Sequence, residues 1–243
     1  MGLPPSIAYD RAITIFSPDG RLYQVEYAFE AVRKGYISLG VKCVEGVVLA
    51  VLNKKQYPLA EPFDKIQKID EHVGLTFAGF ASDARILIDK AREYAQIHRL
   101  IYDEPIPVET LARRICDIKQ IYTQYGGVRP FGVAFLIAGV DSTGPKLYGT
   151  NPQGTYLSFY AHAIGSGSEE ALKILEKNYS LEMSLEKALL LALYTLDKTI
   201  EGGAKKEIID AALVDVKTKK FRILSKDEIG KYLEKMKEES SFS

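Results

Sequence analysis

The sequence predicts an α+β fold, a four-layer αββα sandwich with an extra N-terminal helix. Two observations lead to this fold class. Strand patterns come in hairpins joined by short turns, and helical patterns come in pairs between those hairpins. A doubly wound sheet would instead alternate single strands with single helices. We expect residues 1–12 to form a flexible tail. Because no stretch has the composition of a linker, residues 13–243 are expected to form a single domain.

The first elements are a turn and a helix. Ser17-Pro18-Asp19-Gly20 predicts a turn, because proline fixes φ and glycine accepts a positive φ. A helix is expected over 21–34, where Gly35 supplies a C-terminal stop. Its apolar face would consist of Leu22, Val25, Ala28, Phe29 and Val32.

Strands and helices then alternate in pairs. Two hairpins are expected, 36–43 with 47–52 and 66–69 with 73–78. Two helices and three strands should follow, at 82–101, 107–124, 133–139, 146–149 and 155–164.

The C-terminal part shows two helices, two strands and a last helix. One helix begins near Ser166, and the rest of this part is expected at 184–200, 208–216, 221–224 and 226–238. A serine followed three residues later by glutamate predicts two capping boxes, Ser166 with Glu169 and Ser225 with Glu228. The alternating lysines and glutamates of the last helix predict a solvated face.

The composition excludes several classes of function. Lys plus Arg and Asp plus Glu are balanced at 32 each, whereas nucleic-acid and anionic-membrane binders need a basic surplus. Apolar runs are shorter than the roughly 18 residues that span a bilayer, and the first seven residues do not have the pattern of a signal peptide. Cys43 and Cys116 lie in apolar patterns outside any Cys/His cluster and are expected to be buried, reduced thiols. We therefore expect a cytoplasmic protein without a metal or another cofactor, and with no nucleic-acid or membrane partner.

No familiar catalytic constellation is present in the sequence. His72, His98 and His162 are isolated, and we expect His98 to be packed and hydrogen-bonded on the apolar side of its helix. The run GSGSE at 165–169 lacks the last glycine of a nucleophile elbow and is better interpreted as a helix start.

Two segments resemble the α subunits of proteasomes. Tyr9–Ala28, YDRAITIFSPDGRLYQVEYA, resembles the N-terminal signature of that family over about twenty residues without a gap. Tyr122–Gly132, YTQYGGVRPFG, is also similar to the family, and the resemblance continues through Ala161–Gly165 and the helices that follow, most closely to the archaeal type. It implies the N-terminal-nucleophile hydrolase fold, which agrees with the element order. It also implies a homo-heptameric α ring stacked on β subunits that cleave peptide bonds.

The resemblance also implies that this chain is not catalytic. The β relatives attack with the hydroxyl of an N-terminal threonine, and the free α-amine of that residue acts as the base. Tyr36 stands at the corresponding place here, after about 35 residues that keep its nitrogen acylated. Leu52-Asn53 replaces the acidic partner, and only Lys65 remains of the catalytic set. The alternatives are an active N-terminal-nucleophile hydrolase released by propeptide cleavage, which needs Thr, Ser or Cys at position 36, and a free-standing interaction protein.

Two further implications concern the passage of unfolded protein substrates. Tyr9, Asp10, Pro18 and Tyr27 would order the N-terminal tail as a gate. The residues Tyr125, Gly126, Gly127, Val128 and Arg129 would form a loop that narrows the axial channel. From the residues alone, the two tyrosines also fit ordinary packed aromatics, and the glycines fit a plain helix-to-strand turn.

The last implication is a docking site. Lys65, Gly35 and Phe80 would receive the C-terminal carboxylate of an ATPase activator tail between neighbouring α subunits, with the glycine admitting a peptide backbone. The family more often has leucine where this chain has Phe80. From the residues alone, Lys65 also fits a solvated surface lysine.

Overall fold

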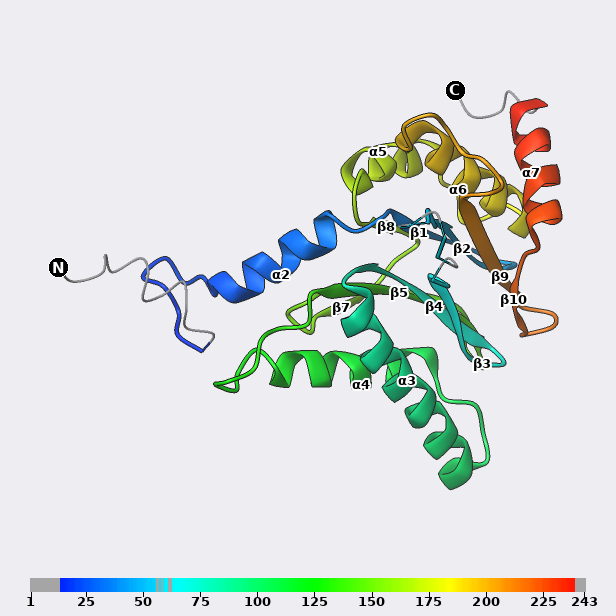
Figure 1. The fold of residues 1–243 in the computed structure, drawn as a ribbon. Coiled ribbons are helices and arrows are strands. Elements are labelled where there is room, and N and C mark those ends of the chain that lie inside the picture. The colour runs from blue at the N-terminus through cyan, green and yellow to red at the C-terminus, as the bar shows by residue number, and fades with distance from the viewer. Residues whose placement is uncertain (1–13, 56, 58, 61–62, 239–243) are drawn as a thin grey trace.

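Two five-stranded antiparallel sheets lie face to face between helical layers (Figure 1). The computed structural model describes residues 14–55, 57, 59–60 and 63–238 of the chain. The strand orders are β10-β9-β2-β1-β8 in the first sheet and β3-β4-β5-β6-β7 in the second. The four-layer αββα sandwich predicted from the sequence is thereby confirmed. The predicted tail over residues 1–12 lies outside the described residues.

The first sheet is covered by the three C-terminal helices. Its strands are β1 (Ser38–Cys43), β2 (Gly46–Leu52), β8 (Ala161–Ile164), β9 (Ile209–Asp215) and β10 (Phe221–Ile223). The helices on its outer side are α5 (Ser168–Asn178), α6 (Leu185–Thr199) and α7 (Lys226–Glu238) (Figure 1).

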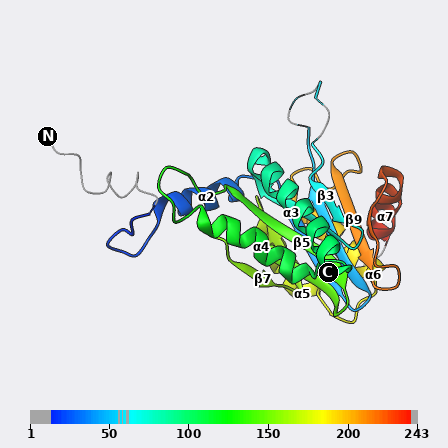
Figure 2. The same ribbon diagram turned by 90° about the horizontal axis from the view of Figure 1, so that it is seen from below.

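The second sheet is covered by the two central helices. Its strands are β3 (Ile66–Asp70), β4 (Val73–Gly79), β5 (Val133–Asp141), β6 (Gly144–Thr150) and β7 (Tyr156–Ser158). Figure 2 shows α3 (Ala81–Tyr102) and α4 (Val108–Ile121) lying across its outer face.

The alternation of side chains along β2 shows why both faces of a sheet are buried. Val47, Leu49 and Val51 point between the sheets, while Val48 and Ala50 point toward the helical layer. Because successive side chains of a strand point to opposite faces, a strand that is buried on both faces needs an apolar residue at every position. The segment of β2 has this pattern.

Helix α2 (Tyr23–Arg33) precedes β1 and projects from one end of the sandwich (Figure 1). Its Val25, Ala28 and Val32 are buried, and the helix packs across β4 and β5. The predicted turn ahead of it is confirmed, since Gly20 N donates to Ser17 O at 2.8 Å and Gly20 has a φ of +74°.

The single strand predicted over 155–164 is wrong, because this segment crosses from one sheet to the other. Phe159 N donates to Leu147 O of β6, whereas Tyr160 O accepts from Lys42 N of β1. Strand-like bonding continues through the crossover, so the sequence pattern shows no break there.

One of the two predicted capping boxes forms. Glu228 N donates to Ser225 Oγ at 3.3 Å, and Ser225 N donates to Glu228 Oε2 at 2.8 Å. The box at Ser166 is wrong: α5 begins two residues later, after Gly167 in a left-handed conformation, and Ser166 N instead donates to Gly35 O.

The last helix is amphipathic rather than simply solvated. Ile229, Leu233 and Met236 of α7 are buried and join the cluster that contains α6. Three apolar residues at helical spacing are enough to dock a helix whose other positions are charged.

The surroundings of the two cysteines and the polarity of the helices bear on two further expectations. Cys43 and Cys116 are buried free thiols, as expected, and burial raises the pKa of Cys116 to about 11. Across the described ranges, every helix is too short or too polar to cross a membrane.

Candidate functional site

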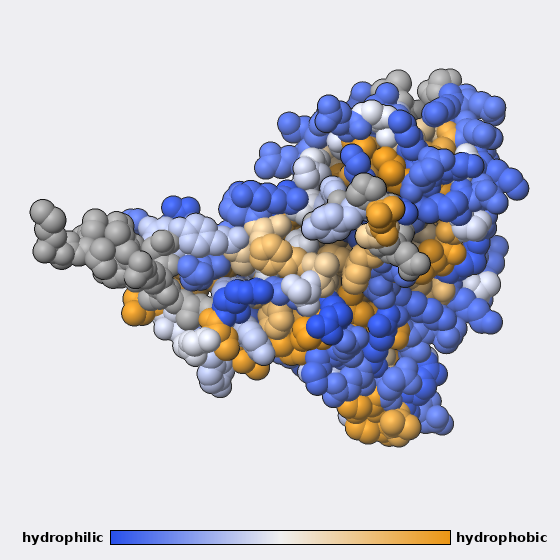
Figure 3. All heavy atoms as spheres, in the orientation of Figure 1, coloured by the Kyte–Doolittle hydropathy of each residue, from blue (hydrophilic) through white to orange (hydrophobic). Residues whose placement is uncertain are grey.

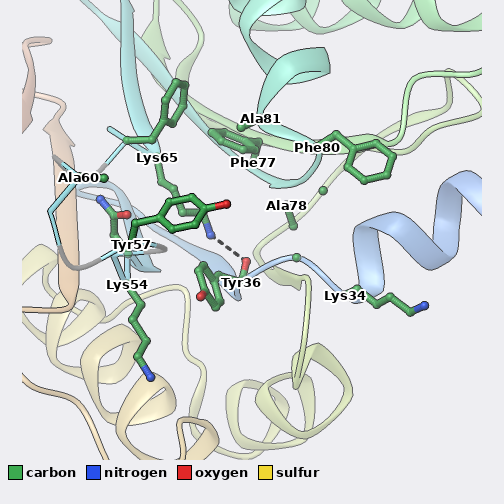
Figure 4. A pocket seen from close by; sticks show the side chains of 14 residues that line it. Lys34, Tyr36, Lys54, Tyr57, Ala60, Lys65, Phe77, Ala78, Phe80 and Ala81 are labelled. Carbon is green, nitrogen blue, oxygen red and sulfur yellow. Dashed lines mark hydrogen bonds between the residues drawn. The ribbon is translucent and has the colours of Figure 1, made fainter.

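A cavity of about 490 Å³ opens where α2 joins the sandwich, and it contains all three predicted docking residues (Figure 4). Gly35 comes from the α2–β1 connection, Lys65 from the start of β3, and Phe80 from the β4–α3 junction. The remaining lining residues belong to the end of β4, the first residue of α3, the α2–β1 connection and the segment between β2 and β3. The structure therefore brings together residues that lie 45 positions apart in the sequence.

Lys65 lies at the base of this cavity and is only 6 % exposed, so it is not a solvated surface lysine. Its Nζ donates to Tyr36 O at 2.7 Å and is 3.4 Å from Ile37 O (Figure 4). The rings of Tyr36 and Phe77 each lie with their centroids 5.9 Å from the ammonium nitrogen. The side chain thus ties the start of β3 to the start of β1.

Burial changes the acidity of this ammonium. Removal from water disfavours the charged form and lowers the pKa of Lys65 to about 7, although attraction to Asp210 acts in the opposite direction. At neutral pH the amine is therefore poised between its two forms, and a carboxylate placed beside it would favour the ammonium.

The close approach that Gly35 permits is made by the chain itself. A Cβ at position 35 would lie 2.4 Å from Gly79 N, which no side chain tolerates. Gly79 in turn has a φ of +115°, and a Cβ there would lie 2.1 Å from Gly132 O. Part of the cavity wall is therefore a direct contact between two backbones, in which Gly35 packs against Gly79 at the end of β4.

Phe80 forms the rim of the cavity and is 51 % exposed. Its backbone N donates to Gly132 O at 2.9 Å, and its ring lies 5.8 Å from the Arg129 guanidinium. The same ring borders a neighbouring hollow of about 400 Å³ that also includes Tyr27 of α2. Phe80 thus separates two hollows along the root of α2.

The predicted channel loop follows α4, and its residues differ in their surroundings. Gly126 and Gly127 face open space, Gly127 has a φ of +84°, and Tyr125 is 63 % exposed. Arg129 instead binds Asp83 of α3 through two hydrogen bonds, from Nη1 to Oδ2 at 2.6 Å and from Nη2 to Oδ1 at 2.8 Å. Arg129 is therefore an anchor for the end of the loop.

Asp83 was missed by the sequence reasoning, because its position in the first turn of α3 is typical of any helix. Burial opposes its ionisation, but hydrogen bonds from Arg129 and from Gly132 N outweigh that effect and hold the pKa of Asp83 below its usual value. The carboxylate joins α3, the loop and the start of β5.

The predicted gate is only partly described. Pro18 is exposed in the turn before α2, and Tyr27 is 52 % exposed on that helix. Ile15 and Phe16, just before the turn, are also exposed. Tyr9 and Asp10 lie outside the described residues, so the gate stays a prediction.

Tyr36, which the resemblance predicts to stand at the place of the nucleophile, lies just ahead of β1. Its carbonyl is occupied by Lys65, and its chain continues back into α2. Asn53, at the position expected for an acidic partner, donates from Nδ2 to Asp210 Oδ2 at 2.6 Å. Asp210 was also missed, because within β9 it alternates with apolar residues like any half-buried strand position.

The histidines lie apart from this cavity. His72 Nε2 bonds with Ile106 O at 2.8 Å, and burial lowers the pKa of His162 to about 4. His98 is buried as expected, but neither ring nitrogen has a hydrogen-bond partner in the described structure. Its ring packs against Tyr102, and its Nε2 lies 3.8 Å from Glu104 Oε1. The described residues contain no group of side chains with the composition of a metal site.

Comparisons with known proteins identify the family of this chain. Residues 32–214 match the family model described as proteasome subunit, and residues 9–31 match the model of the N-terminal signature of A-type proteasome subunits. A proteasome alpha subunit from Pyrococcus horikoshii is 52 % identical over 239 residues, which cover 98 % of this chain and 91 % of that protein.

Two more distant relatives carry the same name. The proteasome alpha subunit of Methanothermobacter thermautotrophicus is 49 % identical over 95 % of this chain and 94 % of its own length. That of Saccharolobus islandicus is 47 % identical over 96 % of this chain and 98 % of its own length. Because the signature, the domain and relatives of nearly equal length all agree, the chain belongs to the family of proteasome subunits and is an α-type member of it.

Proposed function

We propose that this α-type chain is a non-catalytic structural and gating component of the proteasome core particle. Copies of it form a homo-heptameric outer ring on the β subunits, admit unfolded proteins to the proteolytic chamber, and dock the C-terminal tails of ATPase activators. Tyr9, Asp10, Pro18 and Tyr27 form the gate, and the loop over 125–129 narrows the channel.

The observation that carries this proposal is the way the chain enters β1. Tyr36 takes the place of the nucleophile, and α2 precedes it as a folded, continuous helix. The backbone nitrogen of Tyr36 belongs to a peptide bond and has no basic lone pair, so the threonine-type mechanism lacks both its hydroxyl and its base.

The cavity supports the docking role. Lys34, Lys54 and Lys65 line it, and none of its described lining residues carries a carboxylate. The rings of Phe63, Phe77 and Phe80 add apolar surface. Positive charge beside apolar walls suits a peptide end with a free carboxylate and bulky side chains.

Exposed apolar surface supports assembly with other subunits. An apolar patch covers the protruding end of α3 in Figure 3, and Leu100 and Ile101 in the last turn of that helix are 85 % and 65 % exposed. Phe16, near the start of α2, is 65 % exposed. Such apolar patches on a soluble protein are typical of contact surfaces.

Co-expression with a β subunit tests the proposal. The chain alone should form a heptamer or a larger ring in native mass spectrometry and should not hydrolyse peptides. The joint particle should hydrolyse them, and blocking the β threonine should abolish that activity. Peptide hydrolysis by the chain alone would favour the active-hydrolase alternative, and a strict monomer would favour a free-standing interaction protein.

A further inference from the structure

The ammonium of Lys65 has no bonded counter-ion in the described structure. Both of its hydrogen-bond acceptors are backbone carbonyls, of Tyr36 and Ile37. The other charged residues that line the cavity, Lys34 and Lys54, are also cations, and their ammonium groups point away from Lys65 (Figure 4). A buried ammonium whose hydrogen-bond partners are all neutral is poorly stabilised, so a carboxylate near the cavity wall favours its charged form.

Asp210 of β9 is such a carboxylate. In the β2–β9 ladder it pairs with Val51, next to the terminal pair of Leu52 and Ile209. Its Oδ2 accepts from Asn53 Nδ2 at 2.6 Å, and Asn53 itself lines the cavity. Asn53 N also donates to Ile208 O at 2.7 Å, so this part of the wall is fixed to β9 through both backbone and side chain.

Lys226, the first residue of α7, shares this carboxylate. Its Nζ donates to Asp210 Oδ1 at 2.7 Å and to Ile209 O at 2.8 Å. The side chain of Lys226 is 48 % exposed, whereas that of Asp210 is 20 % exposed. Lys226 therefore neutralises part of the charge of Asp210 at Oδ1, the oxygen that does not bind Asn53, while Oδ2 is linked to the cavity wall through Asn53.

The other titratable groups around the cavity differ from Asp210 in their chemistry or in their exposure. Tyr36 and Tyr57 line it with phenol groups, and Asp64, next to Lys65 in the chain, is exposed. Asp210 is the charged residue whose attraction raises the pKa of Lys65 against the effect of burial.

We propose that Asp210 is a positioning residue of the docking cavity. It fixes the wall through Asn53, and its charge keeps Lys65 in the form that binds a partner's terminal carboxylate, while Lys226 weakens that charge. The proposal rests on the docking role of the cavity and adds the residues that determine the pH range in which docking works.

The direction of each effect follows from the charges. Docking of a carboxylate requires the ammonium, so affinity falls as pH rises through the pKa of Lys65, which is about 7 before a ligand binds. Asp210→Asn removes the attraction and should move this fall to lower pH. Lys226→Met leaves the charge of Asp210 less neutralised and should move the fall to higher pH. Asn53→Ala should weaken binding without moving the pH at which it falls.

The experiment uses assembled rings and a short apolar peptide with a free C-terminal carboxylate, with its C-terminal amide as the control. Fluorescence anisotropy from pH 6 to 9 gives the affinity of each variant. We expect the midpoint to fall by roughly half a pH unit or more in Asp210→Asn and to rise in Lys226→Met. General damage to the fold would not move two variants in opposite directions. Equal shifts in both, or no shift in either, would overturn the proposal.

A second readout separates this proposal from the docking role. Rings labelled with ¹³C at lysine Cε report the titration of Lys65 by NMR without any peptide, and Lys65→Arg assigns the signal. Opposite displacements in the two variants support the charge effect of Asp210 directly. If the signal moves in this way but the wild-type ring binds neither peptide, the docking role fails while the effect of Asp210 on Lys65 stands. If the signal does not move, the effect of Asp210 is refuted even where the peptide binds.

Discussion

At the scale of single residues, buried cations join connections that are distant in the sequence. Lys65 holds the start of β1 through the Tyr36 carbonyl. Lys119 of α4, fully buried, donates to Val133 O at 3.0 Å and to Thr150 Oγ1 at 2.8 Å. Burial lowers the pKa of Lys119 to about 7 as well. Both lysines bind neutral oxygens, so neither gains the stability that a carboxylate partner would give.

Replacing Lys65 by methionine should therefore separate stability from docking. Lys65→Met removes a poorly compensated buried charge at nearly constant volume, so the thermal midpoint of the ring should stay the same or rise. Stimulation of peptide hydrolysis by an ATPase activator should be lost. Lys54→Met, at the same cavity, is the matched control and should retain most of the stimulation. Full stimulation of Lys65→Met particles would remove Lys65 from the docking site.

Arg129 and Asp83 give the opposite case, a buried carboxylate with a cationic partner. Arg129→Met leaves Asp83, whose side chain is 8 % exposed, without that partner and should destabilise the protein by about 2 kcal/mol. Because the pKa of Asp83 is lowered in the folded state, its contribution is present above the unfolded pKa and is lost as pH falls through the folded one. Urea unfolding at pH 7 and pH 3 measures both effects. The deficit of Arg129→Met should shrink at pH 3, and an equal deficit at both pH values would contradict this role.

At the scale of elements, the root of α2 is a contact between glycines. Gly35 ends the helix as the sequence predicts, but its partner Gly79 lies in a segment whose pattern indicates only the end of a strand. Single-sequence patterns do not reveal that two backbones touch. The need for glycine at both positions became visible only when α2 was placed against β4.

Gly79→Ala should prevent normal folding of this junction. The added Cβ would lie 2.1 Å from Gly132 O at a backbone φ of +115°, so we expect a loss of about 3 kcal/mol or more, together with loss of ring assembly. Gly126→Ala is the matched control, because its Cβ would meet open space. Thermal unfolding and native mass spectrometry compare the two variants. A Gly79→Ala ring with wild-type stability would show that the junction relaxes easily.

At the scale of the whole molecule, α2 projects from one end of the sandwich (Figure 1). The turn at Ser17–Gly20 and the exposed side chain of Tyr27 lie along this projection. Two of the proposed gate residues, Pro18 and Tyr27, therefore belong to this projection, and the proposal is that the tail ahead of them obstructs entry.

Removal of residues 1–11 should therefore raise the basal peptidase activity of the assembled particle and make it insensitive to an activator. Tyr27→Ala should have the contrasting effect of reducing stimulation while the tail is present. Native mass spectrometry controls for the assembly of both particles. Unchanged basal activity after the truncation would show that the tail does not obstruct entry.

The sequence by itself determined the elements of this protein, because a helix or a hairpin bonds residues that are close along the chain. The helical pattern at 21–34, the continuous apolar run of β2 and the capping box at Ser225 could all be predicted from neighbours, and the family resemblance added Lys65, Gly35 and Phe80. Only the tertiary structure decided the partners: that β7 and β8 belong to different sheets, and that Arg129 meets Asp83. It also placed Asn53 against Asp210, which is 157 residues away. Such pairs depend on the order of strands and the packing of layers, for which the local periodicity of a single chain carries no signal.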